Sequence, residues 1–263
     1  MPKFALPNRS TLIAGALIVA AGLASNDLKV GGFLARLSYD LPFRFRESRP
    51  TEAIMVTIDD QSRKDFGLPA GIPLPRKLQA ELLERLTRDG AKVAFYDLIF
   101  DMPSDDAAGD EAFAAAMRKA GNVVLSGLYE TPDRDVANVD IVTQPAPIFR
   151  DAAHAWGLSG PISLDPDNAV RRIGVPRVEE ELAHWKVAEL VGAPVTNRPE
   201  MHRTIRWLNY YGPAFTIPWC TFYEALHDQP SGFFHDKIVC IGGRPSPAGR
   251  KFGQDEFAFP YSR

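Results

Sequence analysis

Hydrophobic residues recur along this chain with periods of two and of about 3.6 residues, which predict strands and helices in alternation. In residues 53–59, Ile54, Val56 and Ile58 occupy alternate positions, and the positions between them are also largely apolar. A strand that is covered on both faces has this pattern. We therefore expect a buried strand of a parallel sheet in this segment.

A helix and a second strand are expected next. Proline near a helix start and glycine just past its end favour a helix from Pro75 to Gly90. The helix buries one stripe of leucines: Leu78, Leu82, Leu83 and Leu86. Residues 93–100 form the next strand, so the unit should close as a right-handed parallel crossover.

The same unit is repeated once. Asp110 can cap a second helix, which stops at Gly121, and residues 123–128 form a third strand. Further along, the patterns predict a helix over 180–191, a strand over 204–211, a short helix over 220–227 that Cys220 opens, and a buried strand over 238–241.

The middle of the chain has different chemistry. The sequence Asp165-Pro166-Asp167-Asn168 favours a turn and lies between apolar segments at 157–164 and 170–178. This arrangement predicts a hairpin. The expected fold class is therefore α/β, with a mostly parallel central sheet, helices on both faces and an antiparallel hairpin insertion.

An N-terminal segment precedes this domain. Residues 12–24 are an unbroken apolar run behind Lys3 and Arg9. The run is shorter than the roughly 20 residues of a bilayer span, and a cleavable signal peptide has the same pattern. The apolar helical face continues from Leu28 to Leu37, which favours one retained transmembrane helix. A buried core helix would explain poorly why the run lies behind basic residues at the N-terminus.

An anchor and a signal peptide would both export the remainder of the chain, because the basic residues precede the apolar run. The polar segment 47–51 contains Pro50 and marks a boundary. We expect residues 1–25 to be a membrane anchor or signal peptide, 26–50 an amphipathic connector and 51–263 an extracytoplasmic domain. The location would be the inner membrane, with the domain facing the periplasm.

Composition narrows the function classes. The chain has 263 residues, enough for a sizeable core, and its formal net charge of −3 offers no basic field for nucleic acid. Two cysteines, Cys220 and Cys240, make no disulfide framework. We interpret them as buried free thiols, with a single disulfide as the alternative.

Enzyme motifs are absent from the sequence. No dinucleotide-binding glycine motif follows a strand, and neither a phosphate-binding loop nor a nucleophile elbow occurs. The five histidines are scattered without metal-ligand spacing. We therefore expect no catalytic residue, metal or cofactor in this chain.

Acidic residues at strand ends are the remaining candidates for a site. Asp59 and Asp60 end the first strand, Asp97 lies in the second, and Asp101 comes just after it. Ligands of open parallel sheets bind outside the carboxyl ends of the strands, and carboxylates there could hold Mg²⁺ or Ca²⁺. Turn and cap chemistry is the alternative explanation.

Arg76 lies in the first turn of a predicted helix, where a cation is disfavoured by about 0.3–1 kcal/mol. An anionic neighbour would remove this penalty, and it could be Asp59, Asp60 or an anionic ligand. A structural ion pair and a ligand contact therefore both stay open. Our candidate ligand-binding residues are Asp59, Asp60, Arg76, Asp97 and Asp101.

Several segments between residue 37 and the end of the chain have a specific order and spacing. They are Ser38-Tyr39-Asp40-Leu41-Pro42-Phe43-Arg44, Val56-Thr57-Ile58-Asp59-Asp60, Pro75-Arg76, Gly90-Ala91, Phe95-Tyr96-Asp97-Leu98-Ile99-Phe100, Asp165-Pro166-Asp167 with Arg171, Asn209-Tyr210-Tyr211-Gly212-Pro213, Asp236-Lys237-Ile238-Val239 through Gly242, and Asp255-Glu256-Phe257 with Pro260. Together they resemble the second type of cyclase/histidine-kinase-associated sensory extracellular domain. The chain departs from that family at the hairpin glycine, which Asn168 or Ala169 replaces, and at Ile72 and Leu74, where tryptophans are frequent.

The resemblance implies an extracytoplasmic sensor, joined through further membrane helices to an intracellular adenylate or guanylate cyclase, histidine kinase or serine/threonine kinase. The chain would then be an incomplete signalling protein that continues beyond residue 263. Its expected partners are the membrane, an unknown small-molecule or protein signal, and a second copy of itself.

Two other functions stay open. A metal-dependent hydrolase would use Asp59, Asp97 and Asp101, and its carboxylates should converge on a metal. A membrane-tethered assembly subunit would instead expose a large apolar patch.

The export signal gives a test of location. We expect alkaline phosphatase fused after Arg263 to be active, because residues beyond about Ser25 should lie outside the cytoplasm. Enzyme activity in intact cells measures this, with a reporter that is active only in the cytoplasm as the control. A fusion that is active only with the cytoplasmic reporter would contradict the predicted export.

Overall fold

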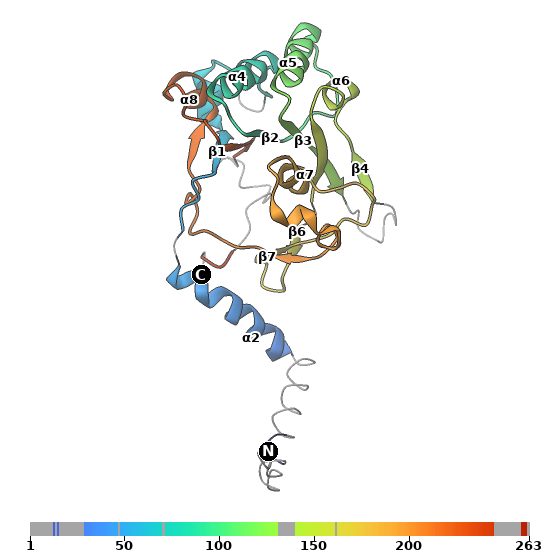
Figure 1. The fold of residues 1–263 in the computed structure, drawn as a ribbon. Helices are drawn as coiled ribbons and strands as arrows, with labels where there is room; N and C mark the ends of the chain where they lie inside the picture. Colours follow the sequence, from blue (N-terminus) through green and yellow to red (C-terminus); the bar gives the residue numbers. More distant parts are fainter. Residues whose placement is uncertain are drawn as a thin grey trace, which may run out of the picture. The chain divides into compact units, whose positions relative to one another are not determined.

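The computed structural model describes residues 13, 15, 29–46, 48–69, 72–130, 140–160, 162–244 and 259–261 (Figure 1). The chain divides into two compact units, residues 1–47 and 48–263. The division falls in the polar segment 47–51, where the sequence predicts a boundary.

The described part of the first unit is helical. It contains α2 (Lys29–Asp40) and the 3₁₀-helix η1 (Leu41–Phe45). Among the described residues, no helix has the length and apolar character needed to cross a membrane. The predicted transmembrane helix falls on residues 1–25, which lie outside the described part of the chain except for Ile13 and Gly15. The structure therefore gives this prediction no support.

A mostly parallel sheet forms the centre of the second unit. Its strands run in the order β4-β3-β2-β10-β1-β9, and β5 pairs with β3 beside them. Only β4 is antiparallel to its neighbour among these pairings. The strands are β1 (Ala53–Ile58), β2 (Val93–Ile99), β3 (Val123–Glu130), β4 (Ile141–Thr143), β5 (Ala155–Ser159), β9 (Trp219–Thr221) and β10 (Ile238–Gly243).

The last described strand of the chain lies in the middle of the sheet. Strand β10 pairs with β1, where Val56 is opposite Ile241, and with β2, where Ile241 is opposite Tyr96. The predicted first and second strands are therefore parallel but not adjacent. Val56, Tyr96 and Ile241 are all fully buried, so this row lies at the centre of the core.

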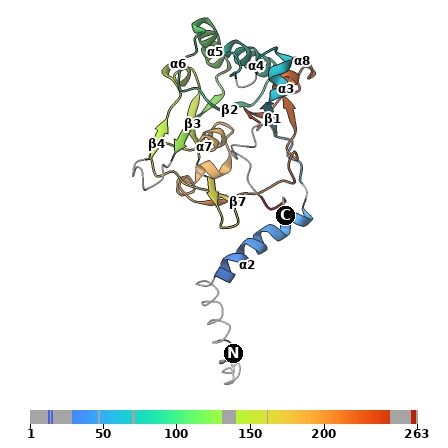
Figure 2. The ribbon, with the colours of Figure 1, turned by 180° about the vertical axis from the view of Figure 1, so that it is seen from behind.

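Helices cover both faces of the sheet, as predicted (Figures 1 and 2). One face carries α3 (Asp60–Asp65), α4 (Arg76–Asp89), α5 (Ala107–Ala120), α6 (Pro147–Arg150) and α8 (Phe222–His227). Helix α7 (Ala183–Leu190) packs against β5 and β3 on the side away from α4 and α5. The main core lies under the larger helical layer and includes a cluster of packed rings, Tyr96, Phe100, Phe113 and Phe149.

Local capping chemistry sets the helix boundaries and corrects two predictions. Gly90 ends α4 with φ of 79°, in the left-handed region that glycine adopts without strain. Helix α5 is capped by Asp106, which accepts from Gly109 N at 3.0 Å, so the prediction that Asp110 caps it is wrong. Asp110 lies instead in the first turn of α5.

The short helix α8 begins after Cys220, not at it. Thr221 is the cap residue: its Oγ1 accepts from Glu224 N at 3.2 Å, and Glu224 Oε2 accepts from Thr221 N at 2.7 Å. A threonine hydroxyl can accept this hydrogen bond well, whereas a thiol is a weak acceptor. Cys220 therefore belongs to β9.

A second, antiparallel sheet contains β6 (Ile162–Leu164), β7 (Val170–Ile173) and β8 (Arg206–Trp207). The predicted hairpin is confirmed in β6 and β7, but the residues before it, up to Ser159, belong to β5 of the main sheet. The predicted strand over 204–211 shrinks to the two residues of β8. The 3₁₀-helices η2 (Pro194–Asn197) and η3 (Pro199–Met201) lie between α7 and β8.

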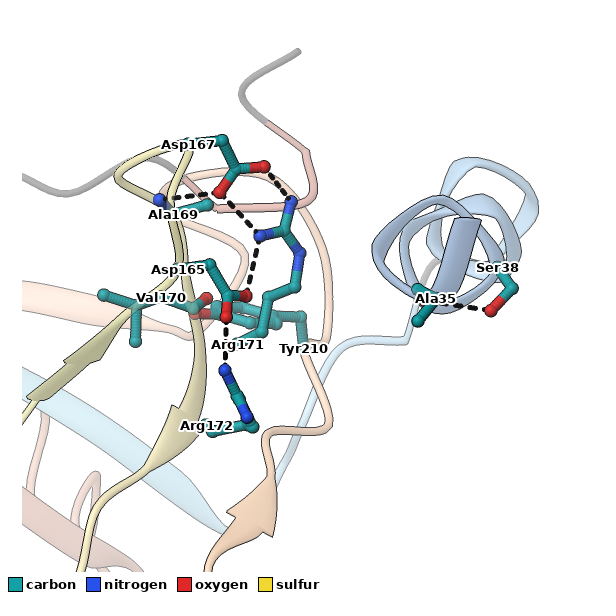
Figure 3. A network of polar contacts seen from close by, with 9 residues as sticks. All are labelled: Ala35, Ser38, Asp165, Asp167, Ala169, Val170, Arg171, Arg172 and Tyr210. Carbon is teal, nitrogen blue, oxygen red and sulfur yellow. Dashed lines mark hydrogen bonds and ion pairs between the residues drawn. The ribbon is translucent and has the colours of Figure 1, made fainter. Parts of the chain in front are cut away.

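A buried arginine organises the β6–β7 turn (Figure 3). The Arg171 side chain is fully buried, and its Nη1 donates to Asp165 Oδ2 and to Asp167 Oδ1, both at 2.9 Å. Its Nη2 donates to Asp167 Oδ2 at 3.0 Å, and Arg172 also pairs with Asp165. The motif that the sequence shows as a turn is therefore also a charge network.

Breaking this network should destabilise the domain. We expect Arg171→Met to lower the free energy of unfolding by about 3–5 kcal/mol, because it leaves the buried Asp165 carboxylate without its main cation. Chemical denaturation measures the change. Arg118→Met is the matched control, because Arg118 pairs with Glu111 on the exposed surface and should lose less than about 1 kcal/mol. Equal losses in the two variants would contradict the structural role of Arg171.

Candidate functional site

The first two predicted site residues, Asp59 and Asp60, lie at the start of α3. Asp59 caps this helix and accepts from Ser62 N at 2.7 Å and from Ser62 Oγ at 2.8 Å. Asp60 lies in its first turn and pairs with Arg63 at 3.7 Å. Both carboxylates thus make the cap and first-turn contacts that the sequence left open as the alternative to a ligand site.

Asp97 has two serine partners, one on β3, which is next to β2, and one on β5, which lies beyond β3. Its Oδ1 accepts from Ser159 Oγ at 2.7 Å and from Ser126 Oγ at 3.2 Å. Asp59 comes directly after β1 and Asp97 lies on β2, and β10 runs between these two strands. Across the described residues, no group of three or more His, Cys, Asp or Glu side chains is placed to hold a metal. The carboxylates of Asp59, Asp97 and the exposed Asp101 therefore do not converge on a common metal position.

Arg76 has the anionic neighbour that its position requires, but on a different element. Its Nε lies 3.6 Å from Asp110 Oδ1 on α5, and its guanidinium stacks over Phe100 at 4.4 Å and Phe149 at 5.4 Å. Burial lowers the pKa of Arg76, and the charges of Asp110 and Asp101 act in the opposite direction. The anionic neighbour is therefore Asp110 of another helix, and not Asp59 or Asp60, the two acids that the sequence left open beside a ligand.

The two cysteines are free thiols, as predicted, but only Cys220 is buried, whereas Cys240 is half-buried. They lie on β9 and β10, which flank β1, so a whole strand separates them. Burial raises the pKa of Cys220 to about 12 and that of Cys240 to about 11. Both thiols are therefore protonated at neutral pH and are weak nucleophiles.

A largely apolar cavity of about 560 Å³ is lined by none of these acids. Its lining comes from β1, from the segment between β8 and β9 together with the first residue of β9, and from the last residue of β10 and residues after it. The lining residues are Met55, Thr57, Leu208, Asn209, Tyr210, Tyr211, Gly212, Pro213, Ala214, Phe215, Thr216, Ile217, Trp219, Gly243, Arg244 and Phe259.

The alternation of side chains along β1 shows which of its residues form the floor of the cavity. Ile54, Val56 and Ile58 face the core under α4 and α8, so Met55 and Thr57 face the opposite side. The cavity therefore lies on the sheet face turned away from those helices. Thr57 is near the carboxyl end of β1, which is the end where open parallel sheets bind ligands.

Aromatic rings form the wall. Tyr210 and Phe259 stack with their ring centroids 5.7 Å apart, and Phe215 and Trp219 lie 5.5 Å apart. Phe215 has a φ of 68°, which is strained for a bulky residue. Gly212 permits the tight path of this segment, since a Cβ there would lie 2.3 Å from Thr216 Oγ1. Strained backbone of this kind is concentrated at functional sites.

The family model of the CHASE2 domain matches residues 13–262, which is nearly the whole chain. The chain belongs to this family. CHASE2 domains are extracellular sensory domains of signalling proteins, so the resemblance found in the sequence is confirmed. A comparison with curated proteins found no match, and neither did a comparison with solved structures.

Sequence reasoning missed the cavity of this CHASE2 domain. It assigned residues 204–211 to a strand and sought the site among carboxylates. The available signal was a cluster of aromatic residues, Tyr210, Tyr211, Phe215 and Trp219, among glycine and prolines with no helical or strand period. Aromatic residues that no core requires indicate a binding surface.

The position of Arg76 gives a test of its role in this CHASE2 domain. We expect Arg76→Met to lower the free energy of unfolding by about 3–5 kcal/mol, because Asp110 would stay buried without its cation. Arg88→Met is the control on the same helix, since Arg88 is exposed. Urea denaturation of both variants measures the difference. A loss below about 1 kcal/mol together with a lost ligand response would assign Arg76 to the ligand instead.

Proposed function

We propose that this chain is the ligand-sensing domain of an extracytoplasmic receptor and that its ligand binds in the cavity described above. Membership of a family of sensory domains supports the first part. The single observation that carries the second is an apolar cavity of about 560 Å³, a volume within the range of small-molecule sites, at about 300–1,000 Å³.

The location of the cavity also supports a ligand site. Thr57, Gly243 and Arg244 lie at the carboxyl ends of two adjacent parallel strands. The sequence predicted a site at this edge of the sheet, but beside carboxylates of β1 and β2. The proposed ligand contacts instead the apolar face of β1 and the aromatic segment before β9.

The ligand site of a sensor must be connected to an element that can move. A ligand shifts the balance between two conformations of the protein only if it binds one of them more tightly than the other. The backbone offers one such connection. Tyr211 lines the cavity, and its carbonyl accepts from Ser48 N at 2.9 Å. Ser48 is the first residue of the second unit. A ligand that shifts the aromatic segment would therefore pull on the chain where it enters the domain.

We further propose that the output is a separate cyclase or kinase domain on the cytoplasmic side and that the receptor is a membrane-anchored homodimer. Helix α2 and the start of η1 expose Leu34, Leu37 and Leu41. Their three- and four-residue spacing is that of a two-stranded coiled coil. This spacing supports pairing of two α2 helices, which would carry the signal toward the membrane.

Filling the cavity tests the proposed site. We expect Met55→Trp to abolish the thermal stabilisation by any small molecule that stabilises the wild-type chain, because the larger ring occupies the floor of the cavity. A ligand at 100 times its dissociation constant adds about 2.7 kcal/mol, or several degrees in Tm. A thermal-shift screen with a small-molecule library measures this.

Met102→Trp is the matched control for this screen, because it makes the same chemical change at an exposed methionine outside the cavity. It should leave stabilisation by the same compounds intact. Compounds that stabilise the Met55→Trp chain as strongly as the wild type would show that the ligand binds elsewhere.

A further inference from the structure

Arg244 introduces a cation into a cavity that is otherwise largely apolar. It comes directly after the last residue of β10, and its backbone N donates to Ile58 O at 2.8 Å. This bond fixes the backbone of Arg244 beside the carboxyl end of β1. The side chain therefore starts from a backbone position that is hydrogen-bonded to the residue at the end of β1.

Two aromatic rings hold the guanidinium in place. Its Cζ lies 4.9 Å from the ring centroid of Phe215 and 5.2 Å from that of Trp219. Both rings line the cavity. Stacking on a ring uses the flat face of a guanidinium and leaves its N–H edge available to donate hydrogen bonds.

No carboxylate of the described residues lies within 4.0 Å of the Arg244 guanidinium, and no acceptor there receives a hydrogen bond from it. Arg76 and Arg171 contrast with it, since each has an aspartate partner. A partly buried guanidinium with no anion among the described residues has unused donors in a site of low polarity. An anionic ligand would supply the missing acceptors, and a carboxylate can take two of the donors at once.

The same arginine disfavours a cationic ligand. Aromatic cages bind cations through the faces of their rings, but the faces of Phe215 and Trp219 already carry Arg244. A second cation would meet a like charge in a cavity whose described lining residues include no acid. The remaining walls, such as the stacked Tyr210 and Phe259, suit a flat apolar group.

We infer that the cavity takes an organic anion, with a flat apolar body against the rings and a carboxylate or sulfonate on Arg244. This inference rests on the proposed function, because it names the ligand class of the proposed site. In this arrangement Arg244 selects ligands that carry a negative group, and the aromatic rings bind the apolar body of the ligand.

Two fluorescent probes with the same ring system separate these contributions. Anilinonaphthalenesulfonate carries a sulfonate, and N-phenylnaphthylamine lacks it. We expect Arg244→Gln to weaken binding of the sulfonate probe by about tenfold or more, since a hydrogen bond to a charged group is lost. Binding of the uncharged probe should change less than about twofold. Fluorescence titration of the full chain measures both dissociation constants.

Three further variants complete the test. Arg88→Gln removes one positive charge from the exposed end of α4 and should leave both probes unaffected. Arg244→Lys keeps the charge without the paired donors, so its dissociation constant for the sulfonate probe should lie between those of the wild type and Arg244→Gln. The lysine variant also replaces the glutamine variant in this test if the latter does not fold. Met55→Trp should abolish binding of both probes, because it fills the cavity.

The outcomes distinguish the two proposals. If both probes bind and are lost in Met55→Trp, but Arg244→Gln affects them equally, the anion inference is overturned and the cavity stays as the site. An equal loss of the sulfonate probe in Arg88→Gln also overturns the inference. If neither probe binds the wild-type chain, or if Met55→Trp retains them, the proposed site itself falls and the inference with it.

Discussion

The pairing of β10 with both β1 and β2 is the contact on which the rest of this domain depends. Val239 and Ile241 of β10 are fully buried, and each has a hydrogen-bonded strand on both sides. A strand in this position joins segments from opposite ends of the chain, and the entropy of closing so long a loop grows only slowly with its length. The same pairing brings Arg244 to Ile58 and so creates one wall of the cavity. The strand pairing that closes the core therefore also shapes the cavity.

Three arginines of this domain differ in role because their neighbouring residues differ. Arg171 is fully buried and has two aspartate partners, which makes it part of the architecture of the hairpin. Arg76 stacks on Phe100 and pairs with Asp110 between α4 and α5. Arg244 has the stacking rings but, within the described residues, no carboxylate. Stacking alone holds a guanidinium in one orientation without using its donors, and this difference separates a structural arginine from one that can bind a ligand.

The acids and the cavity occupy different positions at the carboxyl ends of the parallel strands. Asp59 and Asp60 start α3, and Asp97 joins three strands through Ser126 and Ser159. These hydrogen bonds fix the backbone at the carboxyl ends of β1 and β2. The aromatic segment that faces Met55 is different, because it has little regular structure and contains the strained Phe215. A rigid floor with a less regular wall is a physical basis for a ligand to shift one part of the domain relative to another.

The sequence by itself determined the elements whose signals are local. Alternating residues specified β1, a leucine stripe with Pro75 and Gly90 specified α4, and turn residues specified the β6–β7 hairpin. Family membership could also be recognised from ordered short segments, because each is tied to a local structure. Only the tertiary structure decided that β10 separates β1 from β2, that Arg76 pairs with Asp110 rather than Asp59, and that residues 208–217 line a cavity. These features arise from contacts between residues far apart in the chain, and periodicity within one segment carries no information about which distant segment it meets.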